Sequence, residues 1–555
     1  MSGAEPTARR SRWLLAFAAA IAVIAACSPR DLWAPDEQRY GRIAYDMERG
    51  GDWLVTRWNG TFDAEKPPLG YWIMAGAGRV VGEVDARAAR IPCALMAVLA
   101  VLATAALGRR WFGDPALGDT AALLFATSGL VLWNSSRAGL DLPLTACALL
   151  ATWAGTVFVE RPSLRAALAA GAAVGLGVLF KGPHALYVPV AAVVGGCLAS
   201  GQARRLLAPR WLGALGALLL VVAAWLVPVL LWGGEEYRER LLGQLQSRIS
   251  GRGEPHSHAF PYLIGLLLAC GLPWTPAWGT GLWTAFRARR APAQDRFGLG
   301  AALTGALVPL LLLSLAVSKR DVYLIPLLPC FALLAAYALH RRPAARTERR
   351  SAVWFAVCAA GLGVAALAAP LVIPHLLPEG PLEVVRPEQF TTGLVPWVLI
   401  AIGLALLGGA ALAWRWRSTP VASARILGLV LGSAWIACAL FLLPVFDDVK
   451  TWSSAVPTLQ KEAQGARLVQ LGAPCAALVW AIRPAEVELP SVAYEDIPAR
   501  VDALYAPGAP PVVTILQVKY WDQAQAQHPA LSQRASVLWS RRAGHRLWIA
   551  LVPRR

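Results

Sequence analysis

Two neighbouring carboxylates near the N-terminus are the strongest chemical feature of the sequence. Asp36 and Glu37 stand in "APDEQRYGR", directly after an apolar run, with Arg39 and Tyr40 beside them. Carboxylates at a membrane surface can deprotonate a hydroxyl or amine acceptor, or hold a divalent cation. The structural alternative is a loop acid or a helix start, because "PDE" also caps helices well.

A lysine in a stiff segment follows. In "EKPPLGYW", Lys66 precedes two prolines that restrict its backbone, and Glu65 stands before it. A fixed cation at the lipid surface suits a phosphate, and the carboxylate beside it suits a metal or a role in positioning the lysine. The alternative is a lysine whose stem lies in lipid while its ammonium reaches the interface.

Other corners of the chain mix acidic and basic residues beside Gly or Pro. They hold Arg137, Asp141, Lys181, Lys319, Arg320 and Asp321. Each residue alone is typical of a helix end. All of these residues occur in alternate loops, which would face the same side of a membrane. This indicates a polar site assembled from several corners.

Histidine and cysteine give weaker signals. His256 and His258 in "EPHSHAFPY" could bind a metal together with Glu65, since imidazole and carboxylate both suit zinc. Solvated loop histidines are the alternative, because no third ligand is suitably spaced. The nine cysteines form no CxxC pair, and most lie in apolar runs, where they act as small apolar residues.

The elements that would position these residues are membrane helices. Of 555 residues, 57% are hydrophobic and 15% are charged, against about 25% charged in a soluble chain. Apolar runs near 20 residues long match the hydrocarbon thickness. We predict a polytopic α-helical membrane protein with about thirteen spans, near 13–27, 88–108, 118–134, 142–159, 166–180, 185–200, 211–232, 261–285, 297–317, 322–339, 351–377, 394–414 and 426–446.

The net charge of +18 follows from arginine-rich connections such as "ARRSR", "GRRWFGD" and "HRRPAARTERR". The positive-inside rule places these connections and the N-terminus in the cytoplasm. The charge therefore indicates topology and not a nucleic-acid partner. The run ending in "IAAC" at 24–27 resembles a cleaved signal, but a functional loop directly after it favours its retention as a first helix.

Two domains are expected: a transmembrane domain at 1–446 and a periplasmic α/β domain at 447–555. The first outward loop, 28–87, should contain an amphipathic helix over "DEQRYGRIAYDMERGG" that can lie in the membrane interface, an extended segment, and a second helix after the prolines. In the tail, "RLVQLG", "AALVWAI", "PPVVTILQVKYW" and "HRLWIALVP" favour strands.

No Walker-type or dinucleotide glycine motif occurs in a strand-turn-helix setting. A nucleotide cofactor is therefore not expected. Any activated donor should come from within the membrane or from outside.

The stretch "PDEQRYGRIAYDMERGGDWLVTRWNGTFDAEKPPLGYW" resembles the first external loop of the C-type (GT-C) membrane glycosyltransferases. It is most similar to the aminoarabinose transferase family that modifies lipid A, which is related to the protein O-mannosyltransferases. "GLGVLFKGP" and "SKRDVYLIPLLP" resemble later segments of the family. The resemblance is weakest from residue 447 onward.

This resemblance implies inverting transfer of a sugar from a polyprenyl-phosphate carrier to a lipid, glycan or protein acceptor. The site would face the outside of the bacterial inner membrane. Asp36 would be the general base and Asp141 a second acid. The substrate-binding residues would be Glu37, Arg39, Tyr40, Lys66, Tyr71, Lys181, Lys319 and Arg320. Glu65 and His256 would hold a divalent metal, Zn, Mg or Mn, with His256 preferred to His258 for its spacing to Tyr262.

Three alternatives differ in class. A transporter or flippase of lipid-linked sugars should carry charges in the middle of broken helices, whereas these spans are almost free of charge. A protein O-mannosyltransferase shares the external acidic pair but agrees less well around "EKPPLGYW". A structural membrane protein with a binding tail leaves the loop charges unexplained.

Overall fold

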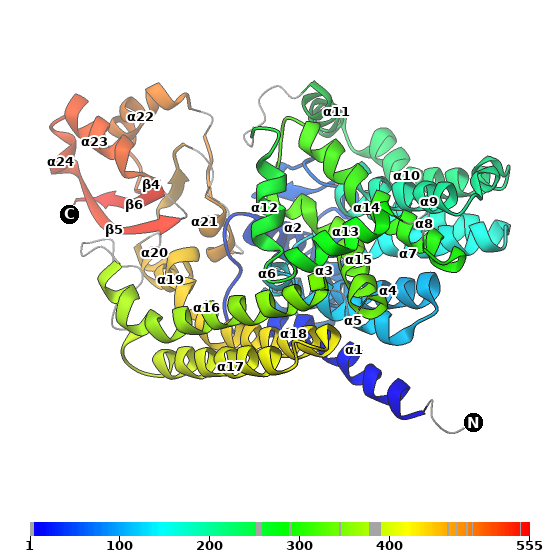
Figure 1. The fold of residues 1–555 in the computed structure, drawn as a ribbon. Coiled ribbons are helices and arrows are strands. Elements are labelled where there is room, and N and C mark those ends of the chain that lie inside the picture. The colour runs from blue at the N-terminus through cyan, green and yellow to red at the C-terminus, as the bar shows by residue number, and fades with distance from the viewer. Residues whose placement is uncertain are drawn as a thin grey trace.

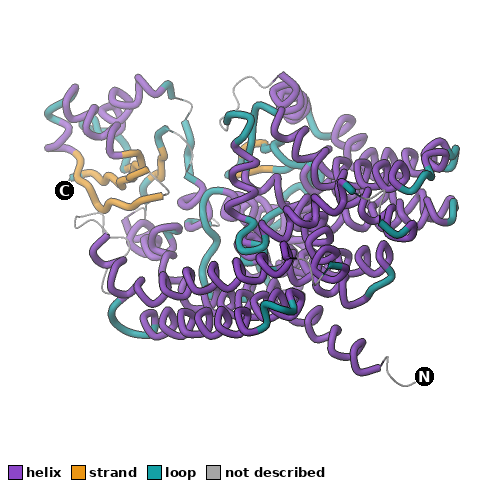
Figure 2. Tube along the Cα trace, in the orientation of Figure 1, coloured by secondary structure: helices purple, strands orange, loops and turns teal. Residues whose placement is uncertain are grey.

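The computed structural model describes residues 5–250, 258–287, 291–342, 346–376, 390–462, 465–472, 475–483, 487–490, 492–543 and 546–554. Helices dominate, and strands occur in a short hairpin and in the C-terminal part (Figure 2). Figure 1 shows the helical part on the right and below, with the C-terminal elements at the upper left.

The helices of the first part are α1 (Glu5–Ala26), α2 (Asp36–Glu48), α3 (Leu69–Val81), α4 (Ala86–Phe112), α5 (Pro115–Ala126), α6 (Gly129–Ser135), α7 (Asp141–Glu160), α8 (Leu164–Lys181), α9 (Tyr187–Ala199), α10 (Trp211–Trp232), α11 (Glu235–Ser250), α12 (Tyr262–Cys270), α13 (Thr275–Phe286), α14 (Ala293–Leu315), α15 (Leu328–Arg341), α16 (Arg346–Leu376), α17 (Val395–Arg415) and α18 (Pro420–Ala437). Short 3₁₀ turns η1 (Pro183–Leu186) and η4 (Asp321–Leu327) precede α9 and α15. Local sequence sets these ends: Asp85 caps α4 by accepting from the Ala88 N–H, and Asp114 caps α5 ahead of Pro115.

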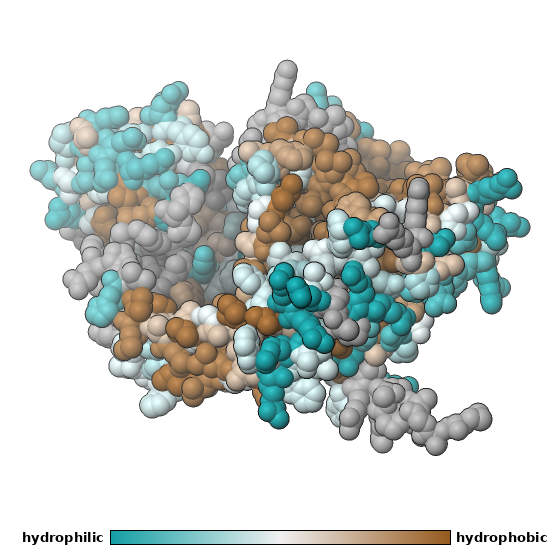
Figure 3. Space-filling model, viewed as in Figure 1, coloured by the Kyte–Doolittle hydropathy of each residue, from teal (hydrophilic) through white to brown (hydrophobic). Residues whose placement is uncertain are grey.

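Among the described residues, nine helices are long and apolar enough to cross a membrane, or up to eleven if each bent pair is one span. The bent pairs are α5 with α6, at 70°, and α12 with α13, at 115°. Arg12–Ala26 and Pro183–Ala199 are shorter apolar helices, so the count of thirteen stays a prediction. Hydrophobic side chains cover the outside of this part, for example over α16 and α17 (Figure 3).

The first loop folds onto the helical part. Strands β1 (Arg57–Trp58) and β2 (Thr61–Phe62) form an antiparallel hairpin between α2 and α3. Nine of the thirteen residues of α2 are buried. Protein covers the polar side of this helix as well as its apolar side, so its position in the membrane interface stays a prediction.

The C-terminal part contains a four-stranded sheet in the order β3-β4-β6-β5. Its strands are β3 (Arg467–Gln470), β4 (Val512–Gln517), β5 (Ala535–Ala543) and β6 (Arg546–Pro553), and only the β3–β4 pair is parallel. Its helices are α19 (Asp447–Lys450), α20 (Val456–Glu462), α21 (Ala476–Ala481), α22 (Ile497–Leu504), α23 (Val518–Gln527) and α24 (Leu531–Arg534). Side chains alternate along β4, so both faces of the sheet pack against helices.

One strand expectation is wrong. The run "AALVWAI" forms helix α21, whose residues Ala477 to Trp480 are all buried. A short apolar run does not distinguish a strand from a buried helix by its periodicity. Strand β5, in contrast, was not anticipated.

The tail, defined here as residues 447–554, forms hydrogen bonds to helix α2 and to the loop around it; these contacts are called the clamp below. Arg42 Nη1 donates to the Val479 carbonyl at 2.8 Å, and Trp480 Nε1 donates to Asp31 Oδ1 at 2.9 Å. A side-chain amide from the hairpin, Asn59, exchanges two hydrogen bonds with the backbone of Val487, at 2.7 and 3.0 Å. The acidic loop is therefore held between the helical part and the tail.

Candidate active site

Asp36 begins α2 and forms an ion pair with an arginine from a distant corner. Arg320 Nη2 donates to Asp36 Oδ2 at 2.6 Å, although the two residues are 284 positions apart. The Asp36 side chain keeps 34% of its surface exposed. This carboxylate is therefore paired and still accessible.

Three cations act on that carboxylate. Burial alone would raise the pKa of Asp36, but the charge and hydrogen bond of Arg320, together with the charges of Lys181 and Arg137, bring the pKa below its ordinary value. Asp36 is consequently ionised at neutral pH. It can accept a hydrogen bond or a proton from a group placed among these cations.

The second acid, Asp141, begins α7 and holds the lysine that ends α8. Lys181 Nζ donates to Asp141 Oδ1 at 2.5 Å, and both side chains are largely buried. Lys181 Nζ also lies 5.4 Å from the ring centroid of Tyr323. A pocket adjoins this pair, and its other lining side chains are mainly apolar or aromatic: Leu144, His184, Tyr187, Val188, Pro309, Leu313, Tyr323, Pro326 and Leu327. The ion pair therefore lies at the edge of apolar surroundings.

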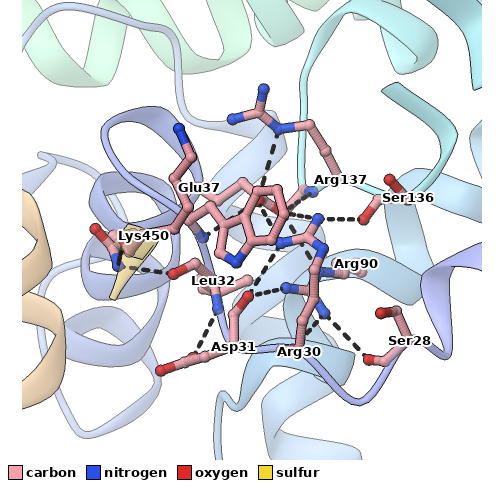
Figure 4. Close-up of polar contacts among 12 residues, drawn as sticks. Ser28, Arg30, Asp31, Leu32, Glu37, Arg90, Ser136, Arg137 and Lys450 are labelled. Atoms are coloured by element: carbon pink, nitrogen blue, oxygen red, sulfur yellow. Dashed lines mark hydrogen bonds and ion pairs between the residues drawn. The ribbon is translucent and has the colours of Figure 1, made fainter. Parts of the chain in front are cut away.

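Glu37 is the centre of a buried arginine cluster (Figure 4). Arg30 Nη1 donates to Glu37 Oε2 at 2.9 Å, and Arg90 Nε donates to Oε1 at 3.3 Å. Arg137 Nε lies 3.6 Å from Oε2, and the Ala138 N–H donates to Oε1. Burial alone would raise the pKa of Glu37, but the three arginines bring it far below its ordinary value. Because the side chain is 1% exposed, Glu37 holds α2 in place, and its predicted contact with substrate gains no support here.

Tyr40 and Tyr71 lie side by side behind the two acids. Their ring centroids are 5.8 Å apart in an edge contact, and both are buried. Burial and the charge of Asp36 raise the pKa of Tyr40 well above its ordinary value. Asp141 raises this pKa further, whereas Arg39 lowers it in part. The Tyr40 hydroxyl is therefore neutral. It lies near two groups of charged residues, one around Asp36 and the other around Arg39.

The charged group around Arg39 includes acids that directly follow the hairpin β1–β2. Arg39 Nε donates to Asp63 Oδ2 at 2.7 Å, and Arg39 also pairs with Glu65. Lys66 Nζ donates to Glu65 Oε1 at 3.0 Å. Glu65 thus positions both cations that were predicted to bind phosphate.

Lys319 contributes differently from its neighbour Arg320. Its ammonium donates to the carbonyl of Ala316 at 2.5 Å and to that of His258 at 2.7 Å. An ammonium has three donors. Lys319 therefore fixes the end of the loop at His258, and bonds to described residues use two of its three donors.

The metal prediction is not supported by geometry. In the part of the chain that the structure describes, no group of three or more His, Cys, Asp or Glu side chains could hold a metal ion. Glu65 is instead paired with Arg39 and Lys66. His256 lies outside the described residues, so a metal held by Glu65 and His256 stays a prediction.

Comparisons with known proteins show the family of the chain. Residues 65–232 match the family model described as Dolichyl-phosphate-mannose-protein mannosyltransferase. Over 492 residues, the chain is 31% identical to the undecaprenyl phosphate-alpha-4-amino-4-deoxy-L-arabinose arabinosyl transferase of Pseudomonas paraeruginosa, covering 87% of this chain and 85% of that protein. The chain belongs to this arabinosyl transferase family. The Erwinia tasmaniensis member is 29% identical, covering 83% of this chain and 82% of its own length.

A solved relative supports the fold of this arabinosyl transferase family member. The structure of ArnT from Cupriavidus metallidurans in the apo state has a TM-score of 0.73 at 22% identity, and covers 98% of each chain. A second structure of that protein, bound to undecaprenyl phosphate, gives the same TM-score. The membrane glycosyltransferase fold predicted from the first loop is therefore confirmed. Because the chain belongs to the arabinosyl transferase family by sequence, it is a membrane glycosyltransferase.

Sequence reasoning missed part of this candidate site. Arg30 and Arg90 were not singled out, and Arg137 was predicted only as one of the charged corners of an assembled polar site. Arg90 carried a usable signal, because an arginine within an apolar span needs a buried partner. Arg30 carried none, since its partner Glu37 and the carbonyl of Ser136, 2.6 Å from its Nη2, are defined only by the fold.

Proposed function

We propose that this transferase moves 4-amino-4-deoxy-L-arabinose from an undecaprenyl-phosphate carrier to a lipid A-like acceptor, with inversion at the anomeric carbon. The names of the relatives support the carrier and the sugar. The observation that carries the proposal is an accessible, ionised Asp36 held among Arg320, Lys181 and Arg137.

The donor fits the distribution of charge and apolar surface. Lys181 lies beside apolar and aromatic side chains of this pocket, and its ammonium can neutralise the carrier phosphate. The other loop segments of the candidate site also supply cations, namely Arg320, Lys66 and Arg39. Asp141 keeps Lys181 in position by its ion pair.

The reaction needs one carboxylate on the acceptor side. An acceptor oxygen forms a bond to the anomeric carbon, while the bond from that carbon to the carrier phosphate oxygen breaks. The electron pair leaves with the phosphate, whose charge the cations stabilise, and any proton of the acceptor oxygen passes to Asp36. No covalent sugar-enzyme intermediate is needed.

The ion pair of Asp36 with Arg320 gives donor binding a second effect. A carrier phosphate competes with Asp36 for Arg320, and drawing Arg320 away removes the largest influence that lowers the Asp36 pKa. Burial then raises that pKa, which makes the carboxylate a stronger base. Donor binding thereby makes Asp36 better able to take a proton from the acceptor.

For location, we propose the bacterial inner membrane, with the N-terminus in the cytoplasm and with the site and the tail on the periplasmic side. The arginine-rich connections support this orientation. A divalent metal at Glu65 and His256 is retained as a proposal and enters no step above; metal analysis of the purified protein tests it.

A protein acceptor is the second candidate, and the match of residues 65–232 to the mannosyltransferase family model favours it. Deleting the gene and comparing lipid A and glycoproteins by mass spectrometry separates the two acceptors. We expect lipid A to lose its added sugar and glycoproteins to stay unchanged. The reverse pattern would assign the chain to protein glycosylation.

Variants that are expressed in the deletion strain test the mechanism. Asp36→Asn should leave lipid A unmodified and lower the rate of the purified enzyme by about 10²- to 10⁴-fold. Glu83→Gln is the matched control, because this loop acid is exposed and pairs only loosely with Arg49, at 3.3 Å. Full rescue by Asp36→Asn contradicts the assigned role of Asp36.

A further inference from the structure

The tail carries a polar hollow far from the acids of the first loop in sequence. It lies where the carboxyl end of β4 meets the starts of α23 and β6, beside Tyr494 and Glu495.

Two stacked tyrosines form one wall of this hollow. The rings of Tyr494 and Tyr520 are nearly parallel, at 5°, with centroids 6.0 Å apart. Tyr520 is buried, and Tyr494 is 59% exposed. Gly472, after β3, has φ +86°, and a Cβ there would lie 3.3 Å from the Tyr520 ring. The buried ring therefore supports an exposed one, whose surface is open to a ligand.

A buried amide supplies the second feature. Gln517, the last residue of β4, lines the hollow and is 8% exposed. Its side-chain amide makes no hydrogen bond to another described residue, and its polar atoms are not among those sealed from solvent, so they remain reachable from the hollow. A ligand with hydroxyl groups can satisfy both its donor and its acceptor.

The charges around the hollow balance. Glu495 and Asp522 line it together with Lys519 and Arg546. A phosphate or a carboxylate would favour cations alone, whereas alternating donors and acceptors beside a flat aromatic ring suit a polyhydroxylated ring. Figure 3 shows that the surface over this part of the molecule is largely hydrophilic.

We propose that this hollow binds a pyranose ring of an envelope glycan, stacked on Tyr494 and hydrogen-bonded to Gln517. The site would hold the carbohydrate of a large acceptor while its reacting group lies at Asp36. The proposal concerns a binding site separate from the reaction centre and deepens the proposed function by adding a second contact to the acceptor.

Saturation transfer NMR on the full-length protein in nanodiscs tests the site, with diacetylchitobiose and maltose as probes. Tyr494→Ala should weaken binding of the bound disaccharide about tenfold or more, and Tyr494→Phe should retain it, because the ring stacks without its hydroxyl. Both variants should transfer sugar to a short acceptor at the unchanged rate.

Asp36→Asn separates this proposal from the proposed function, since it should abolish transfer and keep the disaccharide signal. Loss of signal with Tyr494→Ala but not with Tyr494→Phe supports the site. An equal signal in wild type and Tyr494→Ala, no signal with either disaccharide, or displacement of the sugar by inorganic phosphate at matched concentration overturns it.

Discussion

At the scale of single residues, the neighbouring acids Asp36 and Glu37 lie in different surroundings. Asp36 has one direct ion pair and an exposed edge, whereas Glu37 is enclosed by three arginines. A carboxylate that is ionised and accessible can act on substrate. One that is ionised and enclosed stabilises the arginines around it.

Glu37→Gln tests the enclosed acid. Removing its charge leaves Arg30 and Arg90 buried without a counter-charge, so the free energy of unfolding should fall by about 3–5 kcal/mol. Thermal unfolding in detergent measures this loss. The exposed control Glu83→Gln should change stability by less than about 1 kcal/mol; equal effects of the two variants would contradict the difference in burial.

Arg320→Leu tests the coupling between Arg320 and Asp36. Asp36 must be ionised to act as a base, so activity falls as pH drops through its pKa. Without Arg320 that pKa rises, because burial remains and the main lowering influence is lost. The acidic limb of the pH profile of kcat/KM should therefore move to higher pH. Arg320→Lys keeps the charge and should keep the limb nearer its original position.

The sequence predicted these residues unevenly. Asp36, Lys66 and Lys181 were accessible to sequence reasoning. Asp36 follows an apolar run, Lys181 ends one, and Lys66 stands between a glutamate and two prolines. The enclosed role of Glu37 was not, because its partner Arg90 lies 53 positions away. Distances of that kind are set by helix packing.

At the scale of elements, α2 depends on close packing by a glycine. A Cβ at Gly41 would lie 2.3 Å from Leu32 Cδ1 and 2.9 Å from Trp480 Cζ3. The helix therefore approaches both its own loop and α21 at a position where only glycine fits. This contact orients the helix start, where Asp36 lies.

Gly41→Ala should lower the free energy of unfolding by about 1–3 kcal/mol, because a methyl group overpacks this contact. Activity should fall with it, since α2 carries Asp36. Gly76→Ala in α3 is the matched control: a Cβ there meets nothing within 4 Å, and alanine should be neutral or stabilise the helix by up to about 1 kcal/mol. Thermal unfolding and initial rates compare the pair.

Helix positions were predictable where apolar runs are long, and α4 and α14 lie close to their expected ranges. Two kinds of element were not. The short run at α21 has no length to distinguish helix from strand, and the burial of α2 depends on the tail. Tertiary contacts decided both cases.

At the scale of the whole molecule, the acidic loop is completed by residues from the opposite end of the chain. Lys450, Val479 and Trp480 supply partners to the loop and α2. The tail is consequently part of the site's support, and its independence as a domain stays a prediction.

A chain that ends at Phe446 should insert into the membrane but lose transferase activity, because α2 would lack its outer partners. Protease cleavage within 28–87 should also become faster. The control is full-length Arg467→Gln, which removes only an exposed ion pair with Glu488 and should stay active. Wild-type activity of the truncated chain would show that the clamp is dispensable.

The clamp also sets a time at which the enzyme can begin to work. Arg42 and its partner Val479 are 437 residues apart. At about 5–20 residues per second of synthesis, Arg42 waits on the order of 20–90 s for that partner to be made. We therefore expect a nascent chain that is already inserted in the membrane to stay inactive, and to spare the carrier lipid, until Val479 and Trp480 have been made.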